Sequence, residues 1–159
     1  MIMSSIQAIT TFVEISTPTG GVQHRFQNSE VGSSISLDGS DYSYLSFIYQ
    51  GAAKSLNGDN LIAAMVLAAN PVSMGYAHEA VVNRWNIKVD TCLMNIESFT
   101  VNKKLTTEFW LVSSMAYDNV AVELELSSSL DAISALVPNQ VFTIPLVGHL
   151  PTSSTLTAR

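Results

Sequence analysis

The clearest pattern in the chain is a strict alternation of apolar and polar residues between positions 120 and 126. One side of this segment is entirely apolar: Val120, Val122, Leu124 and Leu126. The other side carries Ala121, Glu123 and Glu125. A period of two is typical of a half-buried strand in an antiparallel sheet. We therefore predict such a strand here, with its glutamates in solvent, where they protect the sheet rather than catalyse.

Other extended segments follow one another along the chain, separated by Gly, Pro, Asn and Asp turn residues. The predicted strands are residues 11–16, 24–28, 34–37, 42–47, 61–69, 85–93, 107–115, 120–126 and 141–147. The Ala, Met and Leu residues of 61–69 favour a helix as well, but its nine residues between a turn and Asn70-Pro71 suit a buried strand better. Short helical turns are expected at residues 72–83, which could equally form a compact loop, and at residues 128–136. The pattern predicts an all-β fold: an antiparallel β-sandwich or barrel with one or two short helices.

For two of these segments we predict which side chains face the core. In residues 85–93 we expect Trp85, Ile87, Val89 and Leu93 to face the core, with Lys88 and Asp90 on the other side. In residues 107–115 we expect Phe109 and Leu111 to face inward. Trp110 and Val112 are apolar as well, so this strand is either central or pressed against a partner. Residues 85–150 are expected to form the central sheet.

The composition holds more apolar residues than a soluble monomer of this size needs. Hydrophobic residues make up 47% of the 159 residues, charged residues only 13%, and the mean hydropathy is +0.28. Burial against other chains is the simplest use of this surplus. We therefore expect an obligate oligomer. The interface candidates are Trp110, Val112, Tyr42, Tyr44 and Leu156.

The charge disfavours a role in binding DNA tightly. The net charge is −6, the pI is about 4.8, and the basic residues are scattered apart from the pair Lys103-Lys104. Tight binding to nucleic acid needs clustered cations, whereas an acidic protein can form a non-adhesive wall beside passing DNA. No segment approaches the roughly 18 apolar residues of a membrane span. The start, MIMSSIQAITTF, lacks the pattern of a secretory signal, so we expect folding in a cytoplasm.

Residues that could carry chemistry do not form a recognisable motif. Cys92 lies in a predicted strand and is expected to be a packed thiol, while His24, His78 and His149 lack the spacing of metal ligands. The segments Asp38–Asp41 and Asn57–Asn60 read as turns rather than calcium loops. No nucleophile motif, P-loop or dinucleotide fingerprint occurs. We therefore expect no catalytic residues, no metal and no cofactor, and no enzyme.

Four segments together resemble a known family. They are LDGSDYSYLSFIYQG, SLNGDNLIAAMVLAAN, VVNRWNIKVDTCLMNIES and EFWLVSSMAYDNVAVELELSSSLDAISALVPN, which cover about residues 34–150. The last is the closest, with a bulky strand, a short turn, an alternating strand ending in Leu-Ser, and an apolar turn into Val-Pro. In this order they resemble the N-terminal domain of the lambda-type minor tail protein L family, from the upper hub of a siphophage tail tip.

The resemblance implies a structural virion protein with a fold like that of phage tail-tube and hub proteins. It implies a homo-oligomer, a trimer in preference to a hexamer, that joins the distal tail protein to the central hub around the DNA channel. The tape measure would be a neighbour, and DNA only passing cargo. The implied location is the virion tail tip after assembly in the host cytoplasm. The family's cysteine-rich, iron–sulfur C-terminal domain has no counterpart here, because Cys92 alone cannot hold a cluster.

On this reading residues 1–33 form an N-terminal strand and arm, residues 34–150 the hub domain, and residues 151–159 a C-terminal arm. The arm, PTSSTLTAR, has one large apolar residue, Leu156. This is too little to offset an ordering cost of about 1–2 kcal/mol per residue, so we expect a neighbouring subunit to hold the arm. The alternative function is a small all-β carbohydrate-binding module, which would need exposed Trp or Tyr beside carboxylates. An enzyme with a site assembled in space is the third possibility.

Overall fold

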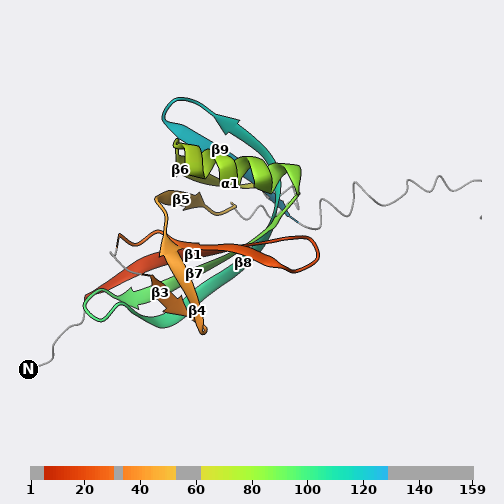
Figure 1. The fold of residues 1–159 in the computed structure, drawn as a ribbon. Coiled ribbons are helices and arrows are strands. Elements are labelled where there is room, and N and C mark those ends of the chain that lie inside the picture. The colour runs from red at the N-terminus through yellow and green to blue at the C-terminus, as the bar shows by residue number, and fades with distance from the viewer. Residues whose placement is uncertain (1–5, 31–33, 53–61, 129–159) are drawn as a thin grey trace, which may run out of the picture.

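The structure, a computed structural model, describes residues 6–30, 34–52 and 62–128. In these ranges the chain forms nine strands and one helix (Figure 1). The strands are β1 (Gln7–Ser16), β2 (Val22–Gln27), β3 (Ile35–Leu37), β4 (Ser40–Tyr44), β5 (Phe47–Gln50), β6 (Ile62–Ala68), β7 (Asn86–Asn95), β8 (Thr100–Tyr117) and β9 (Ala121–Ser128). The helix is α1 (Pro71–Val82).

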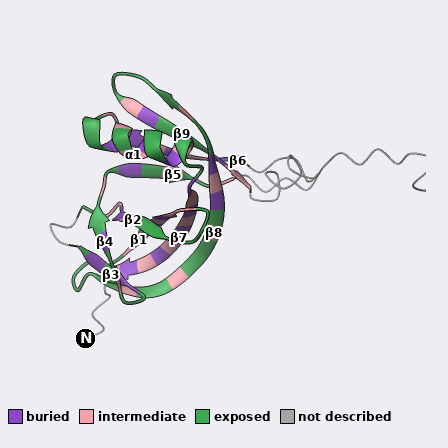
Figure 2. Ribbon diagram, turned by 45° about the vertical axis from the view of Figure 1, so that its right-hand side comes forward, coloured by how far each residue is buried: buried purple, intermediate pink, exposed green. Residues whose placement is uncertain are grey.

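The strands form one mixed sheet in the order β3-β4-β2-β1-β7-β8-β9-β6-β5. All neighbours are antiparallel except β2 and β4, which pair in parallel over two residues. The 18-residue strand β8 pairs with β7 from Thr100 to Leu111 and with β9 from Trp110 to Tyr117. β8 is strongly curved (Figure 2). The predicted all-β fold with a short helix is confirmed, and the bend of one sheet produces the layered packing expected of a sandwich.

Two hydrophobic cores lie on opposite faces of β1 and β7. Odd-numbered residues of these strands, such as Val13 and Ile87, enter the larger core. Even-numbered residues, such as Phe12 and Met94, enter the smaller one. Helix α1 and strands β5, β6 and β9 complete the larger core, and the β3–β4 hairpin covers the smaller one. β1 and β7 are therefore buried on both faces.

The N-terminal segment is part of the body of the sheet. β1 lies between β2 and β7, and its Phe12, Val13 and Ile15 are at most 3% exposed. The boundary predicted at residue 34 is therefore not a break in the fold. Consecutive apolar residues at positions 12 and 13 put one side chain on each face, which marks a central strand.

Several predicted side-chain orientations are wrong. Phe109 is 67% exposed, whereas Trp110 and Val112 are buried, because Trp110 is paired with Ile87 and so faces the larger core. Leu111 is only half-buried. Leu93 is likewise half-buried, since past Val89 the buried side of β7 changes from odd to even residues. Val120 lies in the turn before β9 and is exposed, although Val122, Leu124 and Leu126 face the core as predicted.

Other local predictions are confirmed. The turn Asp38-Gly39 joins β3 to β4 with positive φ angles of 52° and 78°, as a tight two-residue hairpin requires. Residues 62–68 are a strand, residues 71–82 are a helix, and Cys92 is a buried thiol. The elements predicted at residues 128–136 and 141–147 lie outside the described residues apart from Ser128, the last residue of β9.

Asn70 caps helix α1 and should contribute measurably to stability. Its side-chain oxygen accepts hydrogen bonds from the backbone N–H groups of Val72 (3.0 Å) and Ser73 (2.9 Å). Asn70→Ala removes both, and we expect the free energy of unfolding to fall by about 1 kcal/mol in urea denaturation. Asn83→Ala, at the other end of the helix, is the control. An equal or larger loss in the control would contradict the assigned role of the cap.

Candidate interaction groove

The strands β2 and β4 meet at one end and separate at the other. They pair only at Phe26 with Ser43 and at Gln27 with Tyr44. Along Val22–Arg25, β2 pairs with β1 on its other side, and it has no second partner strand among the described residues. In an antiparallel pair, alternate residues turn their N–H and C=O groups away from the partner strand. This part of β2 therefore directs backbone donors and acceptors into the opening between the strands.

A groove of about 510 Å³ lies at this opening, between β2, β4 and the first turns of α1. Three of its lining residues are large, apolar and exposed: Val22, Tyr44 and Val72. The remaining lining residues are Gln23, His24, Arg25, Phe26, Asp41, Ser43, Leu45 and Tyr76. The groove thus combines an apolar wall with polar side chains and open backbone groups.

The floor of the groove is an aromatic cluster around His24. Its imidazole lies 4.4 Å from the Tyr76 ring, 5.7 Å from Phe26 and 5.9 Å from Trp85, between ring centroids. These rings come from β2, from α1 and from Trp85, the residue before β7. Packing between them fixes the helix against β2, so the groove has a preformed floor.

Two charged groups of the groove differ in their partners. Arg25 binds Glu14 through Nε and Oε2 at 2.8 Å, and this hydrogen bond raises the pKa of the guanidinium. Asp41 is exposed and makes no ion pair within the described part of the chain. Asp41 is therefore available as the counter-ion of a cation that binds in the groove.

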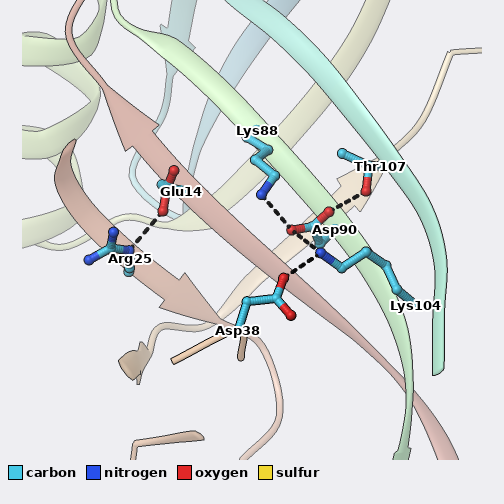
Figure 3. Close-up of polar contacts among 7 residues, drawn as sticks. All are labelled: Glu14, Arg25, Asp38, Lys88, Asp90, Lys104 and Thr107. Carbon is cyan, nitrogen blue, oxygen red and sulfur yellow. Dashed lines mark hydrogen bonds and ion pairs between the residues drawn. The ribbon is translucent and has the colours of Figure 1, made fainter. Parts of the chain in front are cut away.

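A second polar cluster, on the face of the smaller core, serves the fold (Figure 3). Asp90 is 2% exposed, and its carboxylate accepts a hydrogen bond from the Thr107 hydroxyl and lies near Lys88 Nζ (3.2 Å) and Lys104 Nζ (3.4 Å). Lys104 also binds Asp38 at 2.7 Å, which raises the pKa of Lys104 and lowers that of Asp38. This network connects β7 and β8 to the β3–β4 turn.

A third polar contact joins β5 to β8. The indole Nε1 of Trp110 donates to Tyr49 Oη at 2.7 Å, and that hydroxyl donates to Glu108. Burial, followed by the hydrogen bond to Glu108, raises the pKa of Tyr49 well above its usual range. A neutral tyrosine that both accepts and donates holds the end of the larger core together.

The structure corrects three of the five interface candidates. Trp110, Val112 and Tyr42 are 7%, 2% and 3% exposed, and all three side chains lie in the chain's own cores. Trp110 and Val112 are inside because α1 packs against β8, and Tyr42 is inside because its hairpin packs against Phe12 of β1. Tyr44 is exposed and lies in the groove, while Leu156 is outside the described residues.

The histidine, cysteine and acidic side chains that could bind a metal do not come together in the described part of the chain. His24 lies in the groove and His78 on the exposed side of α1, and His149 is outside the described residues. In the described ranges, no three His, Cys, Asp or Glu side chains lie close enough to hold a metal ion. Burial raises the pKa of the Cys92 thiol.

Within residues 6–30, 34–52 and 62–128 no helix is long and apolar enough to cross a membrane.

The groove could not be found from sequence alone. It depends on the parallel contact of β2 with β4, which are not adjacent in the chain, and on where α1 lies. Val22 and Val72 offered only a weak signal, an apolar residue beside a turn.

No family model matches the chain, and no curated protein matches it either.

Proposed function

We propose that the chain is a structural, non-enzymatic subunit of a long-tailed phage, placed in the tail tip between the distal tail ring and the central hub. It acts as a homo-oligomer around the DNA channel, with the tape measure as a further neighbour. The resemblance over residues 34–150 supplies the location. The acidic composition, with a net charge of −6, supports a wall past which DNA slides.

The observation that carries the proposal is an open sheet edge with exposed aliphatic side chains. β5 is the last strand of the sheet, and among the described residues nothing pairs with its outer edge. Ile48 on β5 and Ile62 on β6 are 62% and 53% exposed. Soluble monomers protect such edges with charges, proline or a covering segment. A permanent neighbour would cover this one.

Both tryptophans support a structural role. Trp85 and Trp110 are 6% and 7% exposed and belong to the larger core. A carbohydrate binder uses such rings as exposed stacking platforms, whereas an assembly protein uses them to stabilise its fold.

The proposal predicts a stable oligomer in solution. At micromolar concentration, sedimentation velocity should give one species with the mass of a trimer, or of a hexamer, because obligate interfaces bury more than about 2,000 Å². Ile48→Asp should shift the species toward monomer, while Val120→Asp, at an exposed turn, should not. A well-folded monomer at all concentrations would contradict the proposal.

The tail location needs its own test. Gold-labelled antibody against the chain should mark one end of the long-tailed particles made by cells that carry its gene. Label on particle heads, or none on purified particles, would exclude the tail tip.

Carbohydrate binding stays as a second candidate because of one observation. Tyr44, 44% exposed, lines the groove together with Asp41 and Tyr76. Binding on a glycan array that Tyr44→Ala abolishes would favour this function. Absence of binding by the wild-type chain would remove it.

A further inference from the structure

The opening between β2 and β4 has the properties of a site that receives an extended peptide segment. An added strand needs free backbone donors and acceptors, which β2 offers along Val22–Arg25 within the described part of the chain. It also needs pockets for side chains on both of its faces. The apolar wall of Val22, Tyr44 and Val72, and the exposed carboxylate of Asp41, provide two different ones.

The chain itself contains a segment that matches these two pockets. Residues 151–159, PTSSTLTAR, hold one large apolar side chain, Leu156, and one charge, Arg159. Every other residue there is small or β-compatible, and threonine occurs three times. Leu156 suits the apolar wall, and Arg159 suits Asp41, whose carboxylate has no ion pair among the described residues.

We propose that residues 151–159 of one copy bind in the β2–β4 groove of a neighbouring copy. This inference rests on the proposed self-assembly but not on the tail location. With the segment bound, the groove is a contact between subunits. Each subunit donates its segment to the next, which makes the contact head-to-tail. Such a contact closes into a ring when the rotation between subunits is right.

A crosslinking experiment between two full-length variants tests the proposal. One protein carries Thr157→Cys, and the other carries Gln23→Cys on the exposed side of β2. The native Cys92 is 0% exposed and should not react. After mixing, a short bis-maleimide should join the two variants into a covalent heterodimer, identified by a size tag on one of them.

The hollow between β3 and the start of β8 provides a matched control. It has the same volume, about 510 Å³, and includes the exposed residue Asn102. Asn102→Cys mixed with Thr157→Cys should give no more product than random collision. Equal yields at the two hollows would overturn the inference.

Leu156→Ser in the Thr157→Cys protein should lower the crosslink yield at limiting concentration by at least about tenfold, since the apolar side chain supplies most of the contact. Thr152→Ser should leave the yield unchanged. No difference between these two variants would contradict the assignment of Leu156 to the apolar wall.

The remaining outcomes separate this inference from the proposed function. A Gln23→Cys, Thr157→Cys double variant that crosslinks only within one chain places the segment in its own groove and overturns the exchange. An oligomer that forms normally but gives no groove crosslink overturns the inference and leaves the structural function standing. A monomer overturns both.

Discussion

Replacing Trp110 with alanine is expected to lower the free energy of unfolding by about 3–5 kcal/mol. The side chain is 7% exposed, lies in the larger core, and donates a hydrogen bond from Nε1 to Tyr49 Oη. Truncation leaves a large cavity and removes that donor from a half-buried hydroxyl. Urea denaturation at a fixed protein concentration measures the change, because assembly would otherwise alter the apparent stability.

The adjacent residue is a matched control. Phe109 is also aromatic and lies on the same strand, but its side chain points the other way and is 67% exposed. Phe109→Ala should change the free energy of unfolding by less than about 1 kcal/mol. If Phe109→Ala were the more damaging of the two, the register of β8 against β7 would be wrong by one residue.

Asp90→Ala is expected to cost about 3 kcal/mol of stability. The carboxylate is 2% exposed and is the common partner of Lys88, Lys104 and Thr107. Its removal leaves two ammonium groups close together without their shared counter-ion and a hydroxyl without its acceptor. Thermal or urea unfolding of the variant measures the loss.

Asp38→Asn is the control for Asp90, because both carboxylates bind Lys104 Nζ and asparagine keeps the preference for the positive φ of this turn position. Asp38 is exposed, and solvent screens its ion pair, so we expect almost no change in stability. If Asp38→Asn destabilised the protein as much as Asp90→Ala, the burial of Asp90 would not be the cause of its effect.

The ion pair of Asp38 with Lys104 contributes little to stability, and this small contribution should change only at the extremes of pH. The pKa of Asp38 is lowered, so its contribution is present at neutral pH and is lost as pH falls below its ordinary value of 3.8. The pKa of Lys104 is raised, so its contribution is lost only as pH rises above 10.5. Between these limits this pair should add no pH dependence.

The sequence predicts those features that depend on neighbouring residues. The alternation from Val122 to Leu126 gives β9 and its buried face, and Asp38-Gly39 gives the hairpin turn. Nine residues between a turn and Asn70-Pro71 give β6 rather than a helix. In each case the local pattern and the final environment agree, because one face of the strand meets a single core.

Features that depend on tertiary contacts could not be predicted in this way. β8 is apolar at consecutive positions, and only its pairing with β7 decides that Trp110 is buried and Phe109 exposed. The change of buried side along β7 requires knowledge that the hairpin covers its second half. For the same reason Tyr42 and Trp110 were expected at an interface, although each lies in a core of its own chain.

The most direct test of the proposed ring assembly is the symmetry of the assembled chain. Electron cryo-microscopy of the purified oligomer should show closed rings, threefold in preference to sixfold, around an open central channel. Strand β5 should lie against a neighbouring subunit in that map. Monomers, open filaments, or rings in which β5 faces solvent would contradict the proposal that the chain is a ring-forming structural subunit.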